Sequence, residues 1–444
     1  MKPLILIIVA SLLAIPPVSA NAPAAAQVGK TATPDPVRLK ATVERLVGFG
    51  TRHTLSSTTD TKRGIGAART WAAKEFTKIG KTCGGCLRVE SVTDRFSGPR
   101  APNGAEIVDI LAIQPGTGDP SQVVIIAAHI DSRVSDVMDA TSDAPGANDN
   151  GSGSALVIEA ARVLVGTRFD GTIVYALLSG EEQGLWGGKL LANTAKARGW
   201  QVRAMLNNDI VGNTLGQDGR RVDTRVRVFS EGARASEDEK AVLSRRAIGG
   251  EDDGPSRALA KAIDGLARAD PAIGLEVLAV RRPDRFGRGG DHQPFLEAGY
   301  PAVRFSVGVE NYDRQHQTLR TEGGRVYGDT VDAMDFPYLA KVTALNIATL
   351  RQLASAPAAP AVVSLDGALA MTTNVSWSAV PGARSYRIYW RRADAQDWTD
   401  SKVVTSAETA KLDVVVDDTF IGVSAVSVNG AESLITFGGM APRK

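Results

Sequence analysis

Two adjacent glutamates, Glu181 and Glu182, stand in the stretch LLSGEEQGLWG, directly after an apolar run and between glycines. Neighbouring carboxylates repel each other, and the end of a buried strand is a costly place for both when nothing neutralises them. The rest of the chain must therefore supply a cation or a protonatable partner for this pair.

Other polar side chains follow apolar runs in the same way. The run QVVIIAAHIDS predicts a buried strand that ends at His129 and Asp131, and VRAMLNND predicts another that ends at Asp209. Asp149, in APGANDNGSG, leads into a helical pattern, and the late segment ENYDRQHQT supplies His316. Because ligands gather at the carboxyl ends of parallel strands, we expect these side chains to meet.

Two histidines and three carboxylates in such positions fit a pair of zinc ions about 3.5–4 Å apart, bridged by one carboxylate and one water. A single metal would not need this many ligands, and an all-oxygen calcium or magnesium site would not need histidine. Histidine nitrogens without thiolates favour zinc, with manganese or cobalt as substitutes. One of the adjacent glutamates would then neutralise a cation, and the other would face the metal-activated water as a base for peptide hydrolysis.

Strand and helix patterns alternate through most of the chain. The segments with helical spacing are 36–48, 64–79, 152–165, 184–199, 255–268 and 335–354. Apolar runs between them predict strands. This alternation predicts an α/β fold with a mixed, mostly parallel sheet and helices on both faces. The charged segment 231–254 has no strong periodicity, so we expect a solvated loop there.

The chain begins with a lysine, an apolar run and small residues before position 20, which predicts a signal peptide over residues 1–20. The run is too short for the ~20 residues that cross a bilayer, and no later run is long enough. We therefore expect an exported protein, periplasmic or secreted.

Loss of the leader lowers the formal charge from +2 to +1, because the leader holds Lys2 and no acid. This balance gives no indication of a nucleic acid partner.

The two cysteines, Cys83 and Cys86 in TCGGC, are expected to form a short structural disulfide in an exported protein.

The composition changes after residue 355, where ASAPAAPAVVSL predicts a linker. Residues 360–444 then alternate apolar and polar positions between turn signals, which predicts a small all-β sandwich. We expect one domain over residues 21–355 and a second over 360–444.

The motifs together resemble peptidase family M28, the co-catalytic zinc exopeptidases that include bacterial aminopeptidases. The resemblance covers residues 36–353 and rests on the ordered set HID, APGANDNGSG, SGEEQGLWG, NNDIVGN, GGDHQPF and QHQT. It implies the zinc exopeptidase (phosphorylase/hydrolase-like) fold and two Zn²⁺ per chain. The carboxy-terminal segment resembles a fibronectin type III domain, through Trp377, YRIYW and VSAVSVNGAES.

The M28 resemblance also implies roles for the metal ligands. His129 and Asp209 would bind one zinc, Glu182 and His316 the other, and Asp149 would bridge the two ions.

The remaining roles implied by the resemblance concern proton transfer and support. Glu181 would be the general base, and Asp131 would orient the imidazole of His129. Many relatives carry a tyrosine before the last zinc-binding histidine, but this chain has Gln315 there, with Tyr312 nearby. Three further residues are expected to support the pocket or lie near its rim without binding metal: Asp291, His292 and His53.

The sequence therefore predicts an exported di-zinc aminopeptidase that acts on peptide substrates. Another M28-like exopeptidase, a carboxypeptidase or a dipeptidase, is an alternative, because specificity depends on loops. A glutaminyl cyclase-like acyltransferase with a single zinc is a further alternative, against which His129 and Asp209 argue together. The third alternative is a non-catalytic binding protein that uses the hydrolase fold as a scaffold. The presence of Glu181, the expected general base, argues against this alternative.

Overall fold

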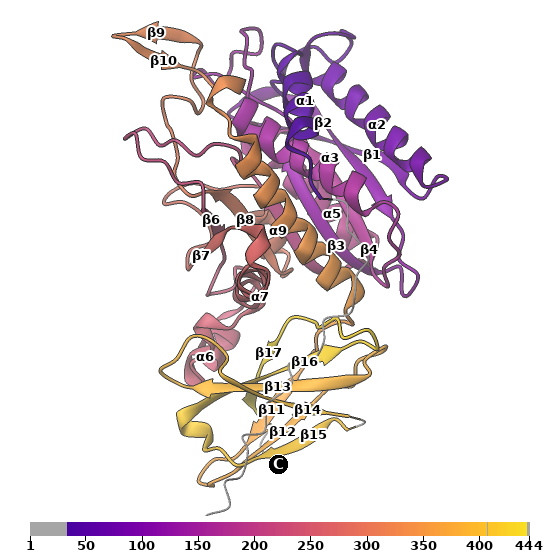
Figure 1. Cartoon of the computed structure of the whole chain (residues 1–444), viewed down its shortest axis with the longest axis vertical. Helices are drawn as coiled ribbons and strands as arrows, with labels where there is room; N and C mark the ends of the chain where they lie inside the picture. Colours follow the sequence, from indigo (N-terminus) through magenta and orange to yellow (C-terminus); the bar gives the residue numbers. More distant parts are fainter. Residues whose placement is uncertain (1–32, 406, 442–444) are drawn as a thin grey trace, which may run out of the picture. The chain divides into compact units, whose positions relative to one another are not determined.

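The computed structural model describes residues 33–405 and 407–441 (Figure 1). The predicted signal peptide, residues 1–20, lies outside the described residues. An eight-stranded sheet has the strand order β1-β2-β4-β3-β5-β8-β6-β7. Its strands are β1 (Arg88–Gly98), β2 (Ala101–Gln114), β3 (Gln122–His129), β4 (Thr172–Leu178), β5 (Gln201–Asn208), β6 (Arg225–Phe229), β7 (Glu276–Val280) and β8 (Ala302–Val307).

The centre of the sheet is parallel and its flanks contain antiparallel pairs. Strands β4, β3, β5 and β8 run parallel to one another, whereas β2 pairs antiparallel with β4 and β6 pairs antiparallel with β8. The predicted mixed, mostly parallel sheet is thus confirmed. The β1–β2 hairpin was not predicted, because β1 is largely exposed and its polar sequence RVESVTDRFSG lacks an apolar run.

Helices cover both faces of the sheet, as predicted. The α-helices of the described residues are α1 (Pro36–Val47), α2 (Gly64–Thr82), α3 (Gly153–Leu164), α4 (Glu181–Gly184), α5 (Trp186–Ala197), α6 (Glu239–Ala247), α7 (Pro255–Ala269), α8 (Gln293–Glu297) and α9 (Phe336–Ser355). Helices α1, α2, α3, α7 and α9 share one apolar core with one face of the sheet, and α5 and α8 share a second core with the other.

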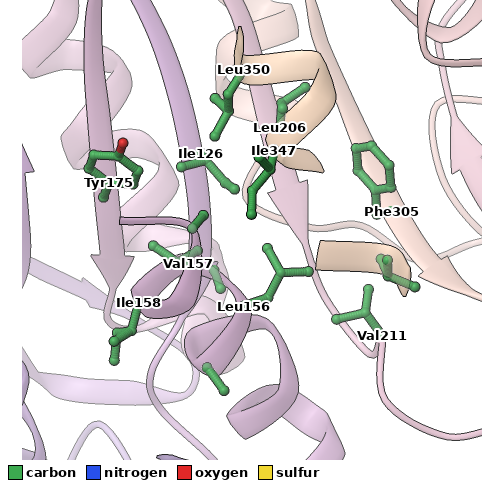
Figure 2. Packing of buried hydrophobic residues seen from close by; sticks show 14 of the residues in the cluster. Ile126, Leu156, Val157, Ile158, Tyr175, Leu206, Val211, Phe305, Ile347 and Leu350 are labelled. Atoms are coloured by element: carbon green, nitrogen blue, oxygen red, sulfur yellow. The ribbon is translucent and has the colours of Figure 1, made fainter. Parts of the chain in front are cut away.

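Alternation along the central strands separates the two cores. Ile126 of β3 points to the face covered by α3 and α9, and its neighbours Ile125 and Ala127 point to the opposite face. Figure 2 shows Ile126 and Leu206 from the strands packed beside Leu156, Ile347 and Leu350 from the two helices. Burial on both faces explains why these strands read as unbroken apolar runs.

The charged segment 231–254 corrects one expectation. It contains helix α6, which begins after Asp238, whose side chain accepts a hydrogen bond from the backbone N–H of Ala241. Arg245 and Arg246 occupy its last turn, where cations are favoured, and none of its residues is buried. The capping residue and the favourably placed charges therefore stabilise this helix. Its sequence has no apolar periodicity, so the pattern did not predict it.

Residues after α9 form two four-stranded sheets around a small apolar core that includes Trp377, Tyr386 and Ile388. Their strands are β11 (Val363–Asp366), β12 (Thr373–Trp377), β13 (Ser385–Arg392), β14 (Asp400–Val404), β15 (Thr409–Leu412), β16 (Thr419–Val426), β17 (Thr436–Phe437) and β18 (Gly439–Met440). The likeness to a fibronectin type III domain and the boundaries of the two predicted domains stay predictions.

Two smaller features complete the fold. Cys83 and Cys86 form the expected disulfide at the end of α2. Strands β9 (Arg320–Glu322) and β10 (Arg325–Tyr327) form a separate hairpin that was not predicted. Within residues 33–405 and 407–441, no helix is both long and apolar enough to cross a membrane.

Candidate metal centre

Strand register brings the first candidate ligands together. His129 at the end of β3 lies beside Leu178 at the end of β4, and Ala127 of β3 pairs with Asn207 of β5. Asp209, two residues beyond Asn207, therefore reaches the level of His129. The shortest distance between His129 Nε2 and an Asp209 carboxylate oxygen is 3.7 Å.

The adjacent glutamates begin the short helix α4, directly after β4. Gly180 precedes them with φ +74°, a left-handed conformation that glycine adopts at low cost and that turns the chain from strand to helix. The Asp131 carboxylate accepts the backbone N–H groups of Glu181 at 3.4 Å and Glu182 at 3.2 Å. Asp131 thus fixes the start of α4 as well as lying beside the imidazole of His129.

Asp149 is held in the turn that precedes α3. A Cβ on Gly153 would stand 2.1 Å from the backbone oxygen of Asn208, so only glycine lets this turn lie against β5. The Asp329 carboxylate accepts the backbone N–H of Asp149 at 2.6 Å. These two constraints fix the position from which the Asp149 side chain extends.

The two oxygens of Asp149 face different histidines. Oδ1 lies 3.2 Å from His129 Nε2, and Oδ2 lies 2.8 Å from His316 Nε2. His316 Nε2 also lies 2.9 Å from Oε1 of Glu182. His316 comes from a loop after β8, where its φ of +54° is uncommon for a residue other than glycine. Asp149 is therefore placed between two clusters of possible ligands.

These clusters have the composition of two metal sites. One consists of His129, Glu181 and Asp209, the other of Asp149, Glu182 and His316, and within each the potential ligand atoms lie within 4.8 Å of one another. Among the described residues, the buried atoms His129 Nε2 and Glu182 Oε1 make no hydrogen bond of good geometry, although Asp149 Oδ1 and His316 Nε2 lie 3.2 and 2.9 Å from them. Imidazole nitrogens and carboxylate oxygens are ligands that zinc accepts, so the residues present fit two zinc ions.

The electrostatics of the metal-free site show an excess of negative charge. Burial lowers the pKa of His129, but the charge of Glu181 and the carboxylates around the ring outweigh it and raise that pKa well above its ordinary value. Burial raises the pKa of Glu181 well above its usual range, although the nearby His129 opposes this. Burial also acts to raise the pKa of Asp149, but the two histidines hold it well below its usual range. Bound cations would relieve this repulsion.

Each cluster includes a carboxylate that is paired with an arginine. Arg304, fully buried on β8, contacts Asp209 at 2.9 Å, and Arg133 contacts Glu182 at 2.7 Å. Neither arginine was predicted to belong to the site. The signal for Arg304 is its position within the otherwise apolar run PAVRFSV, where an unpaired charge would be costly. Arg133 stands in a polar stretch after β3, and its sequence context gives no comparable signal.

The remaining predicted residues support the site. The Nδ1 atom of His129 lies 3.1 Å from the backbone oxygen of Asp131 and 3.5 Å from its carboxylate, so backbone and side chain both face the ring. Gln315 donates a hydrogen bond to Asp149 at 3.2 Å, whereas Tyr312 is 54% exposed. Neither cluster includes the three predicted support residues, which contact backbone groups instead: Asp291 accepts from Gly188 N–H, His292 contacts the Pro283 carbonyl and His53 contacts the Val137 carbonyl.

Two cavities meet at Asp149. The smaller, of about 130 Å³, extends over Ile210 and Leu215, and the larger, of about 360 Å³, extends over Glu181 and His316. Four of the predicted ligands line the larger recess, and Asp149 alone of them also lines the smaller one, so a substrate that reached both recesses would pass Asp149.

Comparison with known proteins gives three findings. The sequence model of peptidase family M28 matches residues 109–349. A probable zinc metalloprotease of Leptosphaeria maculans is 42% identical over 401 residues, which cover 89% of this chain and 92% of that protein. Among solved structures, a leucine aminopeptidase precursor from Bacteroides thetaiotaomicron has a TM-score of 0.52 at 15% identity, covering 73% of this chain and 99% of that one. The Fimbriiglobus ruber glutaminyl cyclase has a TM-score of 0.52 at 20% identity, covering 73% and 97%.

Proposed function

Because the chain belongs to peptidase family M28 and is a zinc metalloprotease of that family, we propose that it is an exported di-zinc aminopeptidase acting on peptides. The observation that carries the proposal is the placement of Asp149, whose two oxygens face His129 and His316 at 3.2 and 2.8 Å. A carboxylate placed in this way suits a bridge between two ions.

Five side chains would hold the two ions. His129 and Asp209 would bind one zinc, Glu182 and His316 would bind the other, and Asp149 would be shared. Bound zinc supplies Lewis-acid chemistry: it polarises a peptide carbonyl and lowers the pKa of water.

Glu181 would transfer the proton. Its burial raises the pKa of the carboxyl well above the usual range, which makes it a stronger base than an exposed glutamate. Asp131 accepts the Glu181 backbone N–H and so fixes the start of the helix that carries it. Glu181 would take a proton from the attacking water and deliver it to the amine that leaves.

The smaller cavity supports recognition of a free amino terminus. Its lining includes four carboxylates and one arginine, Arg314, which lies 3.5 Å from Asp332. The other three carboxylates belong to Asp149, Glu310 and Asp329. Glu310 shares its charge with Arg227 and Arg288 outside this cavity, but the lining still offers more carboxylate oxygens, which accept hydrogen bonds from an ammonium group, than guanidinium donors, which bind a carboxylate.

A panel of substrates tests the proposal. The zinc-loaded protein should hydrolyse leucine amides with free amino termini and leave the N-acetylated forms intact. Hydrolysis of the acetylated forms would indicate a different exopeptidase specificity. Conversion of amino-terminal glutamine to pyroglutamate, without peptide hydrolysis, would instead indicate a glutaminyl cyclase, the function named for one of the similar structures.

Export is proposed from the sequence of residues 1–20. Expression of the full chain in a bacterial host should yield a protein outside the cytoplasm whose amino terminus follows Ala20. An uncleaved chain in the cytoplasm would contradict this part of the proposal.

A further inference from the structure

The larger cavity beside the metal centre contains an unusual number of cationic side chains. Its lining includes four arginines: Arg100, Arg133, Arg285 and Arg288. Glu181 and His316 line the same cavity, so the arginines lie along the wall of the recess that the proposed base faces. A substrate group that enters this recess is therefore surrounded by guanidinium groups.

Neighbouring carboxylates do not balance these arginines. Glu310 accepts a hydrogen bond from Arg288 at 3.2 Å, lies 3.5 Å from Arg285 and also pairs with Arg227 at 2.6 Å. Asp284, which pairs with Arg285 at 3.1 Å, is shared with the buried arginine of β8. Several guanidinium groups thus share few carboxylates, and the cavity keeps an excess of positive charge.

The carboxylates that line the cavity belong to the metal centre. They are Asp149, Glu181, Glu182 and Asp209. Two divalent cations would offset their four negative charges, which leaves the arginines to define the charge that a substrate meets. An arginine-lined recess favours a carboxylate, because the planar guanidinium offers paired N–H donors that match its two oxygens.

Two of the arginines have donors to spare. Arg288 is 32% exposed, and its contacts to Glu310 and Gln315 are long, at 3.2 and 3.4 Å. Arg100 is exposed, and the structure gives its side chain one hydrogen bond, to the backbone oxygen of Glu182 at 2.6 Å. A guanidinium carries five N–H groups, so both side chains retain capacity to bind a ligand.

The two cavities differ in charge as well as in size. Each lining includes four carboxylates, but the smaller cavity has one arginine and the larger has four, and Asp149 lines both. A peptide whose ammonium group lies in the acidic recess would have its reacting bond near Asp149. The part that leaves would then extend along the arginine-lined recess.

We propose that the arginine-lined cavity binds a carboxylate on the leaving side of the reacting bond, with Arg288 and Arg100 as specificity residues. This inference rests on the proposed aminopeptidase function. The carboxylate has two sources: the carboxy terminus of a dipeptide, or an acidic side chain in the second residue of a longer peptide.

Four substrates separate these sources. Leu-Gly is compared with Leu-Gly-amide, which lacks only the terminal carboxylate, and Leu-Glu-amide is compared with Leu-Gln-amide, which lacks only the side-chain carboxylate. With the zinc-loaded full chain, kcat/KM should be at least roughly tenfold higher for the carboxylate member of one pair or of both. The pair that shows the preference identifies the source.

Two variants assign the preference to the cavity. Arg288→Gln should reduce the ratio of kcat/KM values by roughly threefold or more, and the Arg100→Gln/Arg288→Gln double variant should bring it close to one. The matched control is Arg282→Gln, from the same loop: Arg282 stacks on the exposed Phe286 and does not line the cavity. This control should keep the wild-type ratio.

The outcomes separate this inference from the proposed function. If Leu-Gly-amide and Leu-Gln-amide are hydrolysed but the wild-type ratios of kcat/KM are close to one in both pairs, the carboxylate site is wrong and the aminopeptidase stands. An equal fall of the ratio in Arg288→Gln and Arg282→Gln would also overturn it. If no free amino terminus is processed, the proposed function fails. Calorimetric titration of the zinc-loaded Glu181→Gln protein with the two members of each pair would still decide the inference, which requires tighter binding of the carboxylate member of at least one pair.

Discussion

The two ligand clusters differ in the way the fold holds them. His129 and Asp209 end neighbouring central strands, and their side chains are 1% and 3% exposed. His316 comes from a loop, has a positive φ and is 23% exposed. In the proposed centre, the ends of two strands therefore position His129 and Asp209. The position of His316 depends instead on the side-chain contacts that hold its loop.

The arginines show the same contrast. Arg304, which pairs with Asp209, is fully buried, whereas Arg133, which pairs with Glu182, is 15% exposed. Removing the partner of a fully buried charge lowers the free energy of unfolding strongly, because water cannot solvate the charge that remains. A partly exposed charge loses less, because water can replace its partner. The comparison shows that the strand-end residues of the first cluster are buried as deeply as the core, while the second cluster includes a residue that solvent reaches.

The largest effect is expected from Arg304→Met in the metal-free protein. The substitution removes the guanidinium beside the buried carboxylate of Asp209 and leaves Asp284 with Arg285 alone, which should lower the free energy of unfolding by about 3–5 kcal/mol. Arg133→Met is the matched control, and it should cost about 1 kcal/mol because its site is partly solvated. Chemical denaturation measures both. Equal losses in the two variants would remove the contrast between the clusters.

Glu181→Gln separates ligand from base within the first cluster. The variant should bind as much zinc as the wild type and lose at least ~100-fold in kcat, because it removes the proton acceptor without removing a metal ligand. Metal analysis and steady-state kinetics on the same preparation measure both quantities. If zinc content falls together with activity, Glu181 is a ligand and the proton acceptor is another group.

A smaller difference is expected in the release of zinc. Since the loop supplies His316 and the strands supply His129, a chelator should remove one equivalent of zinc roughly tenfold faster than the other. His316→Gln should retain the slowly released equivalent, and His129→Gln should not. Release of both equivalents in one phase would mean that the two clusters hold metal equally well.

The smallest effect concerns Asp329, which accepts the backbone N–H of Asp149. Burial raises its pKa to about 7 in the metal-free protein, against an ordinary value of 3.8. The folded state then holds a proton that the unfolded state has lost, so this group stabilises the fold fully below about pH 4 and less as the pH rises through about 7. Asp329→Asn should flatten that fall in thermal stability. A steeper fall of thermal stability with pH in the variant would contradict a raised pKa for Asp329.

Sequence patterns predicted the elements that carry a regular apolar pattern and missed elements that lack one. Strands β3, β4 and β5 appear as unbroken apolar runs, so their ends, and with them His129 and Asp209, could be placed at one edge of the sheet. Strand β1 is exposed and polar, and helix α6 has no buried face, so neither leaves a periodic signal.

The supporting groups were harder to predict than the ligands. Arg133 and Asp329 reach the site through contacts of 49 and 180 residues in sequence separation, which no local pattern encodes. Motif resemblance supplied the candidate ligands, since the order of the motifs along the chain is characteristic. The arginine-lined cavity arises only when segments near residues 100, 133 and 285 come together in the fold.

The most direct test of the bridged two-metal centre is anomalous diffraction at the zinc edge from crystals of the zinc-loaded protein. We predict two zinc peaks about 3.5–4 Å apart, one beside each oxygen of Asp149. A single peak, or two peaks that do not share Asp149, would contradict the proposed centre.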